Sequence, residues 1–118
     1  MTARYICKKI ITATEAANDK GEPGYKVIYE DGYTSWSPKA VFEAGYELIG
    51  NTGHLPGYHE RLLAEGTLLC NNLERLTDWL EGGGHLGLTQ EHKHLLRTQQ
   101  TLMTQLLHTL TERAELLK

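Results

Sequence analysis

The segment LLAEGTLLCNNLERLTDWL, residues 62–80, is the most informative part of this chain for its fold. Leucines recur in it at positions 62, 69, 73, 76 and 80, and Gly66 completes a series with alternating spacings of four and three residues. This heptad spacing lets one face of an α-helix pack against a second helix. Gly66 also lets another backbone approach closely. We therefore expect a helix from Tyr58 that ends in the glycine-rich stretch 81–87.

The second helix of this pair is expected to follow that stretch. Thr89 is a suitable N-cap and Glu91 places a negative charge in the first turn, so a helix should run from there to about Leu116. Its seam is predicted at Leu96, Gln99, Met103, Leu106, Leu110, Arg113 and Leu117. A second set, Leu95, Leu102, Leu106 and Leu116, makes the apolar face wider than one partner helix can cover. We expect the hairpin to pack on the sheet, on another copy of the chain, or on both.

Polar residues within this seam are candidates for binding. Burying Arg113 without a partner would be costly. It is therefore either an edge residue that reaches water or pairs with an acid such as Glu60, or a residue held for an anionic ligand at an interface. Gln99 is a polar residue that adds specificity in either case. Arg61 and Arg97 lie near the expected helix ends.

Residues 1–49 have the composition of a small sheet. Strands are predicted at Tyr5–Ile11, Tyr25–Tyr29 and Tyr33–Trp36, because β-branched and aromatic residues dominate there. Turn residues fill the segment 15–24, and Asp31-Gly32 favours a tight hairpin. Ser37-Pro38 is predicted to supply the N-cap and first position of a short helix that Gly45 ends.

These elements predict an α+β fold: a three-stranded antiparallel sheet with a short helix, followed by a long antiparallel helical hairpin. The expected organisation is a β subdomain at 1–49, a linker at 50–57 and the hairpin at 58–118, all in one folding unit. At 118 residues, the chain is short for a core that it must form alone.

Composition argues against several classes of function. The net charge is −3, which disfavours binding to a DNA or RNA polymer or to an anionic membrane. No apolar run has the length of a membrane span. Cys7 and Cys70 are too few for a disulfide framework or a four-cysteine zinc site, which favours a reducing cytosol. His92 and His94 diverge around a helix and should not chelate a metal together.

Catalytic motifs were not found either. The sequence has no nucleophile elbow and no P-loop, and its carboxylates have the spacing of a solvated helix face. We therefore expect no enzyme, no metal site and no cofactor. Trp36, Tyr33 and Tyr29 could stack on a base, although packing within the sheet is the commoner use of such aromatics.

Two motifs resemble known bacteriophage proteins. The segment Gly32–Glu43 is similar to a pattern, G-Y-x-S-W-S-P-K-x-V-F-E, found in many small phage proteins. The second half resembles a helical hairpin through Arg61, Glu65, Leu69, Leu73, Leu76, Leu88-Thr89, Leu95-Leu96-Arg97, Gln99, Met103 and Glu112-Arg113. Together they resemble the phage Thoeris anti-defence sponge family, whose hairpin is shared with anti-CBASS sponges.

The resemblance implies a homo-oligomer, either a dimer or a hexamer, in the cytoplasm of the infected bacterial host. It implies capture, without cleavage, of small cyclic nucleotide signals: cyclic ADP-ribose isomers and possibly CBASS cyclic oligonucleotides. It also implies pockets between protomers, with Arg113 as a ligand-binding residue and Arg61, Arg97, Gln99, Trp36 and Tyr33 as further candidates. A phage protein that binds another protein through its hairpin face is the alternative.

Overall fold

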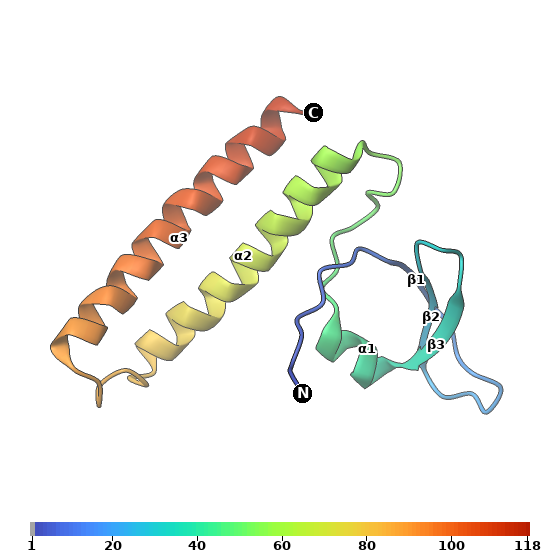
Figure 1. Cartoon of the computed structure of the whole chain (residues 1–118), viewed down its shortest axis with the longest axis horizontal. Helices are drawn as coiled ribbons and strands as arrows, with labels where there is room; N and C mark the ends of the chain where they lie inside the picture. The colour runs from blue at the N-terminus through green and yellow to red at the C-terminus, as the bar shows by residue number, and fades with distance from the viewer. Residues whose placement is uncertain (1) are drawn as a thin grey trace. The chain divides into compact units, whose positions relative to one another are not determined.

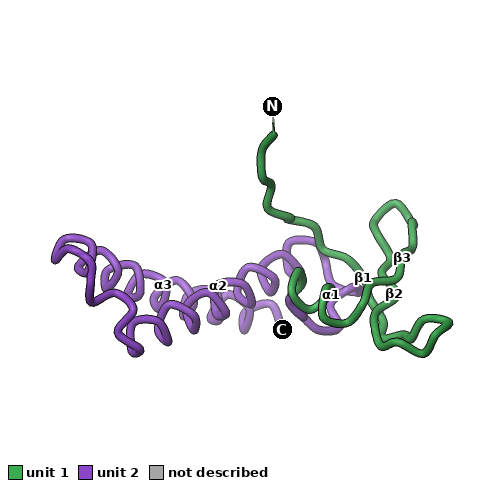
Figure 2. Tube along the Cα trace, turned by 90° about the horizontal axis from the view of Figure 1, so that it is seen from below, with its two compact units in different colours: residues 1–46 green, residues 47–118 purple. Residues whose placement is uncertain are grey.

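The computed structural model describes residues 2–118 and confirms the α+β fold (Figure 1). The chain divides into two compact units, residues 1–46 and residues 47–118 (Figure 2). The first unit, called the β unit below, holds three strands and one short helix. The second unit holds two long helices.

The sheet of the β unit has the strand order β1-β2-β3, with both pairs antiparallel. Its strands are β1 (Thr12–Glu15), β2 (Gly24–Ile28) and β3 (Thr34–Pro38). The prediction of the first strand at Tyr5–Ile11 is wrong, because the β1–β2 turn fixes the register. The Asn18 side chain accepts hydrogen bonds from the backbone N–H groups of Lys20 and Glu22, at 3.0 and 2.9 Å. Thr12 therefore lies opposite Ile28, the last residue of β2, and residues before Thr12 have no strand to pair with.

The second hairpin forms where Asp31-Gly32 predicted it. Tyr29 N–H donates to Tyr33 O at 2.9 Å, and Asp31 Oδ1 accepts from Tyr33 N–H at 3.0 Å. Gly32 has a φ of 88°, in the left-handed region that glycine occupies without steric cost. The loop therefore holds three residues, 30–32, and its glycine supplies the final left-handed position.

Helix α1 (Lys39–Gly45) packs on the sheet through aromatic rings. Phe42 stacks between Tyr25 and Tyr46, with ring centroids 4.2 and 4.7 Å apart, and Val27 beside them on β2 is only 2% exposed. The predicted N-cap at Ser37 is wrong: Ser37 pairs with Tyr25 in the sheet, and Pro38 is the N-cap. Lys39 N–H instead donates to Pro23 O at 3.1 Å, so the backbone of a neighbouring loop satisfies the helix start.

The second unit is an antiparallel pair formed by α2 (Gly57–Glu81) and α3 (Gln90–Leu116), which lie side by side (Figure 1). The predicted N-cap of α3 is confirmed, because the Thr89 side chain accepts from His92 N–H at 3.1 Å. Between the helices, Gly83 has a φ of 78°, and Gly84 lies so close to the Trp79 indole that a β-carbon there would collide with it. The glycines therefore allow a tight connection that buries His85.

The predicted seam of α2 is confirmed: Leu62 and Leu80 are buried, and Leu69, Leu73 and Leu76 between them are half-buried. The seam of α3 is partly wrong. Leu96, Met103 and Leu110 face inward as predicted, but the inward residues that alternate with them are Gln100, Leu107 and Ala114, while Gln99, Leu106 and Arg113 are exposed. Gln100 Nε2–H donates to Thr77 Oγ1 of α2 at 3.2 Å. A β-carbon added at Gly66 would meet no atom of this chain within 4 Å outside its own helix backbone, so no other backbone of this chain approaches Gly66 closely.

A substitution at Gly24 tests how the β unit is held together. A β-carbon there would overlap Ser37 O and the Trp36 indole, so Gly24→Ala should lower the free energy of unfolding of this unit by about 1–3 kcal/mol. Trp36 fluorescence in a Trp79→Phe background follows that unit alone. Gly45→Ala is the matched control, because open space surrounds it and its stability should stay equal or rise by up to about 1 kcal/mol. Equal effects of the two substitutions would contradict the close Gly24–Trp36 packing.

A pair of leucine substitutions tests the corrected seam of α3. Leu110 is 5% exposed and Leu102 is 58% exposed. Leu110→Ala should cost about 2–5 kcal/mol because it leaves a cavity, whereas Leu102→Ala should change stability by less than about 0.5 kcal/mol. Urea unfolding followed by circular dichroism at 222 nm, at low protein concentration, measures both. A larger loss for Leu102→Ala would place the seam on the wrong side of the helix.

Candidate functional site

A stripe of exposed residues runs along α3 beside the seam. Each of its members directly precedes a seam residue, and so lies about 100° around the helix from it. They are Leu95, Gln99, Leu102, Leu106 and Arg113. The three leucines are 56, 58 and 45% exposed, respectively, which is unusual for side chains of this size in one row.

Helix α2 carries a matching stripe. Arg61, Leu68, Arg75 and Trp79 also directly precede seam residues, and Leu68 and Trp79 are 53 and 43% exposed. Two antiparallel helices in contact are related by an approximate two-fold axis, which keeps equivalent heptad positions on the same side of the pair. The two stripes therefore form one surface of the hairpin. We call these nine residues the outer face.

The outer face mixes apolar side chains with guanidinium groups. The exposed Glu65, Asn72 and Thr109 also directly precede seam residues, so one carboxylate and two neutral polar groups lie on the same side of the hairpin. Arg113 is exposed, so the expected cost of burying it does not arise, and among the described residues it forms no hydrogen bond or salt bridge. Glu60, its predicted partner, instead accepts a hydrogen bond from the Thr52 hydroxyl at 2.8 Å. Arg61 folds back over Gly57, and Arg75 donates to the Asn72 side chain. Arg113 is therefore available to an anionic ligand.

The other two predicted site residues of α3, Gln99 and Arg97, lie on opposite flanks of the helix. Gln99 lies on the outer face and its amide contacts Met103 Sδ at 3.7 Å. Arg97 is exposed, but it follows a seam residue instead of preceding one, so it lies on the opposite flank of α3. Leu68, Arg75 and Trp79 were missed by sequence reasoning. The seven-residue spacing of Arg61, Leu68 and Arg75 is the signal that could have found them.

The two predicted aromatic residues of the β unit differ in their environment. Trp36 is half-buried, its ring covers Gly24, and its indole N–H donates to Ala16 O at 2.7 Å. Tyr33 is 64% exposed and stacks on Tyr29 with centroids 5.8 Å apart. These two tyrosines line a hollow of about 400 Å³ with Lys9, Glu30 and Asp31. Tyr33 thus offers an open ring face, while Trp36 packs within the fold.

Hydrogen bonding and burial raise the pKa values of Tyr25 and Cys70. A hydrogen bond to the Glu43 carboxylate raises the pKa of Tyr25 above its ordinary value, and the two oxygens lie 3.0 Å apart. Desolvation and the neighbouring Glu74 raise the pKa of the Cys70 thiol, which makes it less nucleophilic.

No group of three or more metal-ligating side chains occurs among residues 2–118. Within the same residues, no helix is long and apolar enough to span a bilayer.

This arrangement suits binding. Guanidinium groups form paired hydrogen bonds to phosphate or carboxylate oxygens, and leucine and tryptophan side chains cover apolar surface. Such a face can hold a ligand that carries both negative charge and flat apolar rings, or it can pack against a protein.

Comparison with known proteins identifies the hairpin. The family model described as Sequestin matches residues 56–116, a segment that includes all of α2 and α3. Neither the curated proteins nor the solved structures gave a significant match. The family's name denotes sequestration of a ligand, which is a binding role. Because the match covers more than half of the chain, this protein belongs to the Sequestin family.

Proposed function

We propose that this protein is a phage anti-defence sponge, which binds host immune signalling nucleotides and keeps them from their receptors without cleaving them. The proposed ligands are small cyclic nucleotides: cyclic ADP-ribose isomers such as those of Thoeris, and also CBASS cyclic oligonucleotides. The observation that carries the proposal is the Sequestin match over the hairpin, whose outer face presents exposed arginines beside exposed leucines.

The residues of the outer face have separate roles in this proposal. Arg113 and Arg61 pair with the phosphate oxygens, because their guanidinium groups can each donate two parallel hydrogen bonds. The Gln99 amide hydrogen-bonds to ribose hydroxyls. Arg97 lies on the opposite flank, so it is proposed as a secondary contact only. In the β unit, the open ring of Tyr33 is the proposed stacking residue, and Trp36 supports the fold around it.

Self-association is part of the proposal. Leu95, Leu102 and Leu106 leave an apolar row in water when the chain is alone. A second copy laid against part of the outer face would bury that row, and each leucine, about half exposed in the single chain, would gain roughly 1 kcal/mol. The arginines at the margin of the row would then border a site that two protomers build. We propose a homo-oligomer, a dimer or a hexamer, in the host cytoplasm.

A binding panel tests the function. The purified protein is titrated calorimetrically with cyclic ADP-ribose isomers and with cyclic di- and trinucleotides, and linear ADP-ribose serves as the control. At least one cyclic ligand should bind with nanomolar affinity, which is about −12 kcal/mol. Mass spectrometry of the heat-denatured complex should recover that ligand intact. Recovery of a cleaved ligand would indicate an enzyme, and no binding across the panel would contradict the proposal.

The Arg113→Ala variant tests the site. Loss of the guanidinium should weaken binding by at least tenfold, because a charge-assisted pair of hydrogen bonds disappears. Arg113→Lys keeps the charge and should recover only part of that loss. Lys118→Ala is the control, since Lys118 lies near the same end of α3 and pairs with Glu115. Light scattering should give the same mass for all three variants. Unchanged affinity of Arg113→Ala would remove Arg113 from the site.

The exposed leucine row also supports a second candidate function, a module that binds another protein through the hairpin face. Arg113→Ala and a further variant, Leu102→Asp, separate the two functions. In the sponge, Arg113→Ala changes nucleotide binding and leaves the mass unaffected. In an interaction module, Leu102→Asp abolishes capture of the partner while no nucleotide binds at all.

A further inference from the structure

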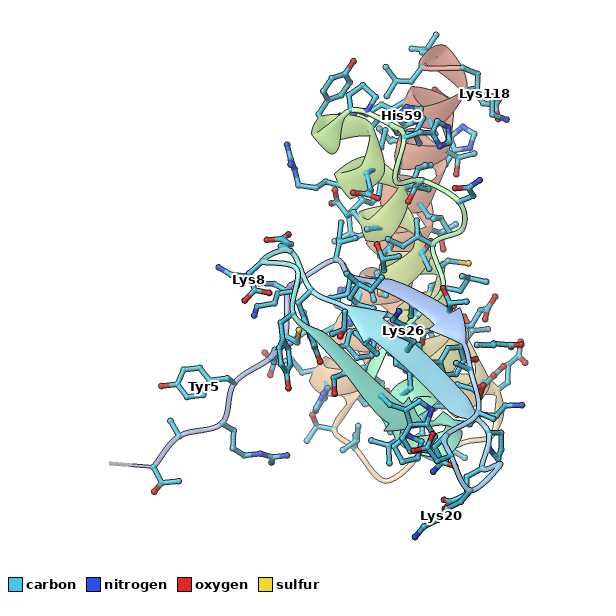
Figure 3. All side chains as sticks on the ribbon, turned by 90° about the vertical axis from the view of Figure 1, so that its right-hand side faces the viewer. Tyr5, Lys8, Lys20, Lys26, His59 and Lys118 are labelled. Carbon is cyan, nitrogen blue, oxygen red and sulfur yellow. The ribbon has the colours of Figure 1, made fainter. Side chains whose placement is uncertain are left out.

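Residues 2–11 form an extended arm that lies outside the sheet. Figure 3 shows Tyr5 on this arm, away from the strands, and Tyr5 and Ile6 are 92 and 96% exposed. The segment Tyr5–Ile11 reads YICKKII, a composition of β-branched and aromatic residues that favours a strand. Within the described chain, it pairs with no strand. Residues 2–9 are thus exposed and Ile10 and Ile11 are half-buried, but none of them pairs with a strand within the described chain.

The arm is poorly built to fold back on its own sheet. Residues 2–14 contain no glycine, proline, asparagine or aspartate, the residues that turns require. The arm therefore continues directly into β1. A partner strand for it has to come from another chain.

The edge of β3 has the properties that such a partner strand needs. The strand order leaves β3 at one edge of the sheet, and Pro38 at its end is a residue that edge strands tolerate. Backbone N–H and C=O groups on that edge can accept another strand.

Charge also matches the arm to this edge. The arm carries Arg4, Lys8 and Lys9 and no acid, whereas residues 12–46 carry six acidic and three basic side chains. Two of those acids, Glu30 and Asp31, lie in the turn that leads into β3, where the chain's own Lys9 lines the same hollow. The edge of β1 is less suitable, because the chain's own basic arm continues from it and would repel a second one.

We propose that the arm, Tyr5–Ile11, adds as a strand to the β3 edge of a second copy of this chain. Backbone hydrogen bonds supply the affinity, as in other cases of strand addition. When each chain gives its arm to the other, the two exchanges are related by a two-fold axis and the assembly closes. This contact uses the β unit alone and does not depend on nucleotide binding or on the outer face of the hairpin.

Hydrogen–deuterium exchange of the intact protein tests the proposal. Amides of residues 5–11 should be protected at high protein concentration and should lose that protection on dilution, as the mass measured by light scattering falls. Free exchange of the arm at every concentration would overturn the proposal. Protection that does not change on dilution would do so too, because it would indicate pairing within one chain.

Cysteine cross-linking identifies the edge. In a Cys70→Ser background, the exposed Cys7 lies on the arm, and single cysteines are placed on β3 at Thr34, Ser35 or Ser37. At least one of these should give a covalent dimer on mild oxidation, well above the yield of Cys7 alone. Thr14→Cys on β1 is the control, and its yield of covalent dimer should not exceed the yield of Cys7 alone. Efficient cross-linking at Thr14 only, or at none of the positions, would contradict docking on β3.

A pair of proline substitutions tests whether the arm pairs as a strand. Ile6→Pro removes a backbone donor and should abolish both the arm's protection and the cross-link, while Thr2→Pro, outside the proposed strand, should leave them unchanged. Because Ile6 is almost fully exposed, the helical circular dichroism signal at 222 nm should not change. Normal cross-linking by Ile6→Pro would show that the arm does not pair as a strand.

Discussion

The contact between α2 and α3 along one leucine seam determines what the rest of the hairpin can do. Leu62, Leu80 and Leu110 are the most buried side chains of this pair, and the half-buried residues between them follow heptad spacing. Once these residues face inward, every residue that directly precedes them is turned about 100° away, toward the outside. The outer face is thus a direct consequence of how the seam is set.

That surface is compatible with the proposed anionic ligand, although the chain as a whole is slightly acidic. A net charge of −3 disfavours a nucleic acid polymer, whose affinity comes from many phosphate contacts. A small nucleotide needs only a few guanidinium groups in one place, and Arg61 and Arg113 lie on the same face as a row of exposed leucines. Membership of the Sequestin family, shown over this hairpin, agrees with a protein that holds a ligand.

The β unit is held together by a different kind of contact from the hairpin. Its stability comes from close aromatic contacts: Phe42 between two tyrosines, and Trp36 over a glycine. These contacts bind α1 and β3 to β2, and they occupy Trp36, whose indole N–H is already hydrogen-bonded. Tyr33, in contrast, stays open. The basic arm has the composition of a strand, but it pairs with no strand within the described part of one chain.

The order of elements, the Asp31-Gly32 turn, the Thr89 cap and the seam of α2 could be predicted from the sequence, because each depends on local chemistry or on residue spacing. It could not set the seam of α3, since Gln99-Gln100 and Leu106-Leu107 offer the same residue type at either position. Packing against α2 determines which residue of each pair faces inward. In the observed orientation of α3, Ala114 faces inward and Arg113 faces outward. Likewise, Tyr5–Ile11 has strand composition, but the Asn18 turn fixed the register so that Thr12–Glu15 faces β2. Pairing partners are tertiary information, and they decided which residues are left free to bind.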